Sequence, residues 1–195
     1  LGARSVVPQA VMTVKYTNSW NDYRTEKKYA RELIDEHCII ISQHSDTTGP
    51  ATACEETSSD VPVYNVSYNQ SMLDIAPTTY LTGCKINWKP YMKSAIDAVL
   101  NDKVIEKHVK GNVNGNDVGA GFDEEWVSML EFKERVKKVI EQFKKGNINV
   151  FQGDYIGVNP DNPSEQIDLK EGYIENEYSS APTFKYILKD IITVE

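Results

Sequence analysis

The sequence predicts an α/β protein with a parallel sheet and helices on both faces of that sheet. Apolar runs of strand length alternate along the chain with segments of helical apolar spacing, which is the order of elements in α/β domains. The run at 38–41 (Cys-Ile-Ile-Ile) is apolar without alternation, as in a parallel strand buried on both faces. A polar loop then leads into Thr48-Gly49-Pro50, where Thr48 fits an N-cap and Pro50 the first turn of a helix. Ligands bind at such strand-to-helix loops in open α/β sheets, so we expect the ligand site here.

The first third of the chain is expected to alternate strands with helices. The expected elements are a strand at 11–16, a helix at 23–36, a strand at 38–43, a helix at 50–57 and a strand at 61–66. Asn21 or Asp22 is the expected cap of the first helix, and its Ala30 and Ile34 belong to one apolar stripe. Successive units of this kind predict parallel strands joined by right-handed crossovers.

The rest of the chain carries weaker signals. The expected elements are a strand at 81–86, a helix at 90–100, a glycine-rich loop or hairpin at 101–125, a helix at 128–145, a strand at 148–156, and short apolar segments around residue 173 and at 184–194. Ser128 and Glu131 match a capping box at the start of the long helix. Gly146 or Asn147 is expected to end it.

Composition and cysteine content exclude several classes of protein. The formal charge of −8 argues against a nucleic-acid partner, which would favour a basic surface. Cys38, Cys54 and Cys84 give no disulfide framework, and each is expected to be a small buried apolar residue. No apolar run is long enough to span a bilayer.

The sequence offers recognition chemistry more than catalysis. It has no Gly-x-Ser-x-Gly motif and no phosphate-binding loop signature. His44 and Asp46 are two residues apart and can share a strand face, but no third metal ligand is evident. We therefore expect a binding protein that is not an enzyme and that has no metal and no cofactor.

Trp20, Asp46 and Asn69 follow successive predicted strands, so we expect them along one edge of the sheet. The indole offers a face to a planar heterocycle, the carboxylate accepts from N–H or O–H groups, and the amide donates and accepts. Each residue also has an ordinary structural alternative. Trp20 can pack over the next helix, Asp46 can cap the helix at 50–57, and Asn69 can be a turn residue.

Several motifs also follow one another in a recognisable order. They are 14–22 (VKYTNSWND), 43–46 (QHSD), 68–72 (YNQSM) with 76–77 (AP), and 81–82 (LT) with 87–91 (NWKPY). In this order and spacing the chain resembles the basic membrane protein family of substrate-binding lipoproteins, which includes purine nucleoside receptors of ABC importers. The likeness runs from the first residue to about residue 100, and 148–153 resembles the family's late strand.

The resemblance implies a type I periplasmic-binding-protein fold, in which two α/β lobes clamp a ligand between them. Residues 1–83 would be the main body of the second lobe, and 84–125 would cross the hinge and belong to the first lobe. Residues 126–195 would supply a helix, a strand and a tail that complete the lobes. Residues 1–6 resemble the segment that precedes the second lobe, so we expect a fragment that lacks most of the first.

The resemblance also assigns roles to single residues. Trp20 falls where the family places a stacking aromatic, and Asn69 falls where nucleoside receptors often carry a ribose-binding Asp. Ile86 replaces a Lys that those receptors place near the ligand. Trp88 and Asp46 match a branch of the family whose ligands are closer to free purine bases or other heterocycles.

The implied function is that of an extracytoplasmic solute-binding component of an ABC importer, which delivers a purine base or nucleoside to the permease subunits. The protein would lie at the cell surface or in the periplasm, held to the cell membrane by an N-terminal lipid on a Cys that this chain lacks. A ligand-sensing domain of a signalling or regulatory protein with the same fold is the alternative, and an α/β enzyme is a third.

Overall fold

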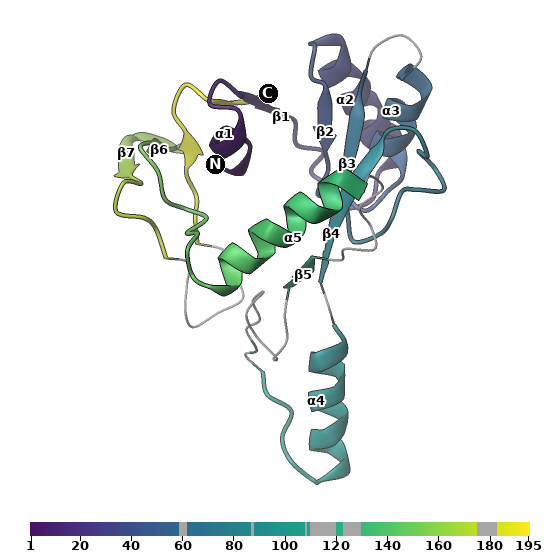
Figure 1. The fold of residues 1–195 in the computed structure, drawn as a ribbon, viewed down its shortest axis with the longest axis vertical. Helices are drawn as coiled ribbons and strands as arrows, with labels where there is room; N and C mark the ends of the chain where they lie inside the picture. Colours follow the sequence, from purple (N-terminus) through teal and green to yellow (C-terminus); the bar gives the residue numbers. More distant parts are fainter. Residues whose placement is uncertain (59–61, 87, 108, 110–119, 123–129, 175–182) are drawn as a thin grey trace. The chain divides into compact units, whose positions relative to one another are not determined.

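The computed structural model describes the chain apart from residues 59–61, 87, 108, 110–119, 123–129 and 175–182 (Figure 1). Its elements are α1 (Gly2–Val6), β1 (Met12–Val14), α2 (Tyr23–Asp35), β2 (Ile40–Ser42), α3 (Gly49–Thr57), β3 (Tyr64–Tyr68), β4 (Tyr80–Ile86), α4 (Lys89–Leu100), β5 (Ala120–Phe122), α5 (Leu130–Lys144), β6 (Ile156–Asn159), β7 (Asn162–Asp168), β8 (Ile187–Leu188) and β9 (Ile192–Val194).

The chain divides into two compact units. Unit 1 consists of Leu1–Val14, Trp88–Val118 and Gln142–Glu195, and unit 2 consists of Lys15–Asn87 and Gly119–Glu141. Each unit is therefore assembled from segments that are far apart in the sequence. The assignment of residues 1–83, 84–125 and 126–195 to two lobes stays a prediction.

Unit 2 is built around a sheet with the strand order β2-β3-β4-β5. β2, β3 and β4 run parallel, and β5 pairs antiparallel with β4 (Figure 1). Helices α2 and α3 pack against each other and against β2 and β3. Their shared core consists of Ala30, Ile34, Ile41, Ala53, Cys54 and Val63. The predicted α/β class with a parallel sheet is confirmed.

Helix α2 begins and ends close to the predicted positions. Asp22 is its N-cap, and the Asp22 carboxylate accepts a hydrogen bond from the backbone N–H of Thr25 at 3.1 Å. Past the last turn, His37 takes φ 70°, a left-handed conformation that stops the helix. Ala30 and Ile34 of the predicted apolar stripe are buried.

Helix α3 is short and approaches α2 closely. The side chains that it buries are small, namely Pro50, Ala51, Ala53 and Cys54. Gly49 opens the helix, and a Cβ atom there would lie 2.8 Å from the backbone oxygen of Tyr23. The absence of a side chain at Gly49 is thus a condition for this approach.

The expectation that the strand after α2 is buried on both faces is wrong. Ile41 is buried against the helices, whereas Ile39 and Ile40 are exposed. Ile40 and Ile41 point to opposite faces of β2, and Ile41 is the one that joins the core formed with the helices. Ile39 lies before the strand begins. Cys84 in β4 is also exposed, so the expectation of a buried cysteine is wrong at that position.

The strand predicted at 11–16 forms, but outside the expected sheet. β1 pairs in parallel with β9, with Thr13 opposite Thr193. The prediction followed the order of elements along the chain, whereas parallel partners are often distant in sequence. Trp20 consequently does not follow a strand of the β2-β3-β4-β5 sheet.

The last part of unit 1 is a small antiparallel sheet with the order β7-β6-β8. The strand predicted at 148–156 is wrong, because β6 begins only at Ile156. Asn149 turns the chain instead, since its side-chain oxygen accepts a hydrogen bond from the backbone N–H of Phe151 at 3.1 Å. The Phe151 ring then stacks on Phe184, with 4.5 Å between the ring centroids.

Helix α5 ends as predicted. Gly146 adopts φ 70°, and its N–H donates to the carbonyl of Phe143 at 2.9 Å. Its predicted capping residue, Ser128, lies outside the described residues. Across the part of the chain that the structure describes, no helix combines the length and the apolar character needed to cross a membrane.

Candidate functional site

The structure brings Trp20, Asp46 and Asn69 together in unit 2, although Trp20 does not follow a strand of the β2-β3-β4-β5 sheet. Their role in ligand binding stays a prediction. The Asp46 backbone N–H donates to the carbonyl of Trp20 at 2.8 Å, and the Asn69 side-chain amide donates to the Asp46 carboxylate at 3.4 Å. The Gln70 side chain adds a hydrogen bond to the Asp46 carbonyl at 3.0 Å. We call Trp20, Asp46 and Asn69, with the two further ring residues His44 and Tyr68, the polar–aromatic cluster.

Local backbone geometry presents these side chains. Asn69 directly follows β3 and adopts φ 65°, a conformation that Asn tolerates better than most residues. Its N–H donates to the carbonyl of Cys84 in the neighbouring strand at 2.8 Å. Trp20 lies in the loop before α2 and is 61% exposed, and Asn69 is exposed as well. Both side chains are therefore accessible to a ligand.

Two further rings extend the indole of Trp20. The ring centroids of Trp20 and His44 are 5.7 Å apart, and those of His44 and Tyr68 are 4.1 Å apart. His44 thus bridges the two larger aromatic side chains. Neither His44 nor Tyr68 was among the predicted site residues. The sequence signal that could have indicated them is their position: His44 is two residues before Asp46, and Tyr68 is next to Asn69.

Two buried side chains hold the loop that carries Asp46. Glu26 in α2 accepts hydrogen bonds from the Ser45 hydroxyl at 2.7 Å and from the Thr47 hydroxyl at 2.5 Å. The Gln43 amide donates to the carbonyls of Ser45 and Thr47 at 3.1 and 2.8 Å. The loop is thereby fixed on both sides of Asp46.

Asp46 does not cap helix α3, which was the structural alternative for this residue. Thr48 is the N-cap residue of α3, and no side-chain capping bond is formed there. The Asp46 carboxylate instead lies beside Asn69. Its position at the sheet edge is therefore not explained by helix capping.

The fourth predicted residue, Trp88, lies in unit 1. It precedes α4, is exposed, and contacts Tyr91 edge to face with 6.3 Å between the ring centroids. Its role in ligand binding stays a prediction.

The described residues contain no arrangement of at least three His, Cys, Asp or Glu side chains that could hold a metal ion. The Cys54 thiol is also a poor candidate for chemistry. Burial raises its pKa to about 12, and the thiolate is the reactive form of cysteine. The polar–aromatic cluster itself presents three rings, a carboxylate and an amide.

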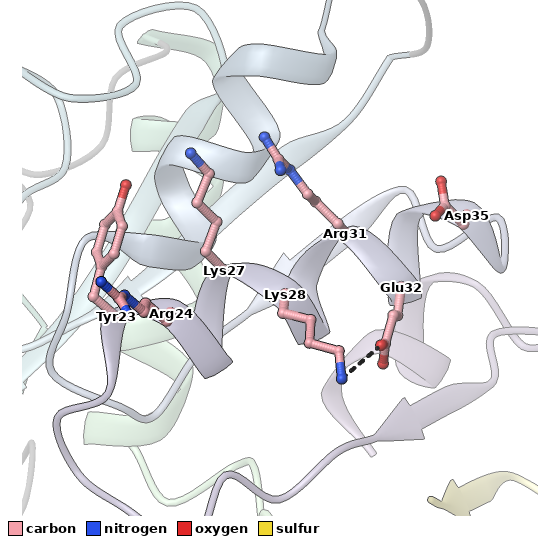
Figure 2. Close-up of a pocket in the computed structure, with 7 residues that line it drawn as sticks. All are labelled: Tyr23, Arg24, Lys27, Lys28, Arg31, Glu32 and Asp35. Carbon is pink, nitrogen blue, oxygen red and sulfur yellow. Dashed lines mark ion pairs between the residues drawn. The ribbon is translucent and has the colours of Figure 1, made fainter.

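A surface hollow along α2 is a different feature (Figure 2). It is lined by Tyr23, Arg24, Lys27, Lys28, Arg31, Glu32 and Asp35. Several of its cations already have carboxylate partners: Lys28 is 3.6 Å from Glu32, and Lys27 and Arg31 both pair with Glu56 in α3. No residue of the polar–aromatic cluster lines it, so we do not assign it to ligand binding.

Comparison with known proteins identifies the family. Residues 1–152 match the family model described as ABC transporter substrate-binding protein PnrA-like. The chain belongs to this family. The match includes every residue of the polar–aromatic cluster and Trp88, whereas β6 to β9 lie beyond it.

Two curated relatives resemble this member of the PnrA-like family. A purine-binding protein of Brucella abortus (strain 2308) is 32% identical over 160 residues, covering 78% of this chain and 42% of that protein. A putative ABC transporter glucose-binding protein of Haloferax volcanii is 30% identical over 155 residues, covering 78% of this chain and 38% of that protein. The chain thus spans about two fifths of the length of these relatives.

Proposed function

We propose that this protein is the extracytoplasmic solute-binding component of an ABC importer and that it binds a purine base or nucleoside. The observation that carries the proposal is the convergence of Trp20, Asp46 and Asn69 in a chain of the PnrA-like family. A purine would stack on the indole, while its ring N–H and exocyclic amino groups, or ribose hydroxyls, would donate to the carboxylate.

The chemistry of the cluster supports a ligand rich in hydrogen-bond donors. The Asp46 carboxylate is acceptor-only when ionised, and the Asn69 amide supplies a further acceptor. The Asp46 N–H is already bonded to Trp20. The row of Trp20, His44 and Tyr68 rings favours a planar partner over a small acid.

In this proposal the protein hands its ligand to the permease subunits of the importer, and closure of two lobes around the ligand is the signal that they receive. The complete protein is anchored at the outer side of the membrane by an N-terminal lipid. Trp88 is proposed as a further ligand contact. No catalysis is involved.

The proposal is tested by mass spectrometry of small molecules released from purified full-length protein. Recovery of a purine base or nucleoside in near-stoichiometric amount is the expected result. Recovery of glucose or another sugar, as the name of the Haloferax volcanii relative would suggest, would overturn the purine assignment.

A further inference from the structure

The loop at 44–48 is held by the buried side chains of Glu26 and Gln43. Asp46 itself accepts hydrogen bonds from Asn69 and Gln70. Ser45 and Thr47 flank Asp46, and their hydroxyls donate to the Glu26 carboxylate. The Thr47 N–H donates to the same carboxylate at 3.3 Å. Gln43 supplies donors to the two carbonyls of these flanking residues. The residues on both sides of Asp46 are thus tied to two buried side chains, Glu26 and Gln43.

The Glu26 carboxylate is buried and bonds to groups of the protein, so it is not a ligand contact. It is only 2% exposed. One of its oxygens accepts from the Asp22 N–H at 2.9 Å, and the other accepts from Ser45 and Thr47. A buried carboxylate is costly unless it is fully hydrogen-bonded. Four donors surround this one, namely two backbone N–H groups and two hydroxyls.

A glutamine of the same size would not replace this carboxylate. Its amide nitrogen is a donor, so one side of the side chain would face donors without an acceptor. The loop would have to move to relieve that contact. Because binding groups need positions accurate to a fraction of an ångström, a small shift of the loop would misplace Asp46.

We propose that Glu26 is a positioning residue that fixes the Asp46 carboxylate for ligand binding without touching the ligand. The inference rests on the proposed function, because it concerns the same site. It links helix α2, through a buried carboxylate, to the edge of the sheet where the ligand binds.

A double-mutant cycle in the full-length protein tests this role, with adenine as the probe and calorimetry as the measurement. Glu26→Gln should weaken adenine binding at least fivefold. In an Asp46→Ala background the same change should alter the affinity by less than twofold, because the group that Glu26 positions is gone. An equal loss in both backgrounds, or no loss in the first, would overturn the proposal.

Glu55→Gln is the matched control. Glu55 in α3 also accepts from two threonine hydroxyls, those of Thr78 and Thr79, each at 2.8 Å, but it serves a loop outside the cluster. Its replacement should lower stability and leave adenine affinity within twofold. A comparable loss of affinity in this control would mean that Glu26 acts only through general stability.

Hydrogen exchange gives a readout that needs no ligand. Glu26→Gln should speed exchange of the Asp46 and Thr47 amides at least tenfold, while Glu55→Gln should leave them unchanged. If Glu26→Gln does not fold, Ser45→Ala removes one of the four donors and should give a smaller change in the same direction. Unchanged exchange in the variant that folds would overturn the proposal. Faster exchange in a protein that binds no purine would instead refute the proposed function alone.

Discussion

The Trp20 indole is open to solvent and touches His44, so its removal tests ligand binding with little effect on folding. Trp20→Ala should weaken purine binding by roughly 5- to 150-fold, because base–aromatic stacking contributes about 1–3 kcal/mol. Calorimetric titration of full-length protein measures this. Tyr16→Ala is the control, since Tyr16 is also 61% exposed and none of the described ring contacts involves it. A change of less than a few-fold for Trp20→Ala would contradict stacking there.

Gly83 in β4 has no room for a side chain. A Cβ atom would collide with the Ser67 hydroxyl oxygen of β3 and would lie 2.9 Å from the Tyr80 hydroxyl. Gly83→Ala should therefore lower the free energy of unfolding by about 1–3 kcal/mol, as overpacked cores do. Urea denaturation measures the change, with Gly2→Ala as the control because that position has open space around it. Equal stability of the two variants would contradict the packing described here.

At the scale of residues, the sequence indicated the solvent-accessible residues of the candidate site better than the buried Glu26 behind them. Trp20, Asp46 and Asn69 could be predicted because loops after strands commonly carry ligand contacts. Glu26 could not, because a Glu on a helix is usually solvated. Its burial depends on Ser45 and Thr47, which approach it only in the folded chain.

At the scale of elements, the Glu165 carboxylate in β7 should make the stability of its sheet depend on pH. Hydrogen bonds from Lys185, Asn159 and Tyr186 lower its pKa to about 2 from an ordinary value of 4.5. Because the pKa is lower in the folded state, this contribution to stability is present above about pH 4.5 and is lost as the pH falls towards 2. Glu165→Gln should therefore lower the urea midpoint of unfolding at pH 6 and should lower it less at pH 3.

The size of that shift should be small, since exposed ion pairs contribute little and are screened by salt. Tyr186→Phe removes one donor to the same carboxylate and should give a weaker effect in the same direction. The same loss of stability at both pH values for Glu165→Gln would contradict the assignment of the lowered pKa to this group.

Helices were easier to predict than strands for a physical reason. The start of α2 at the Asp22 cap and the end of α5 near Gly146 depend on neighbouring residues. Strand partners depend on residues far away in the chain. The pairing of β1 with β9 could not be predicted for that reason, and the Asn149 turn competed with the apolar pattern at 148–156.

At the scale of the whole molecule, we propose that a purine binds to unit 2 through the polar–aromatic cluster. The PnrA-like family match covers this part of the chain, and the stacking and acceptor groups lie next to each other within it. The complete protein closes a second lobe over the ligand in this account.

A crystal structure of the full-length protein with bound adenine or adenosine is the decisive test of this binding mode. We expect the base to lie parallel to the Trp20 indole and to donate a hydrogen bond to the Asp46 carboxylate. A purine bound elsewhere, with both side chains in contact only with water, would contradict it.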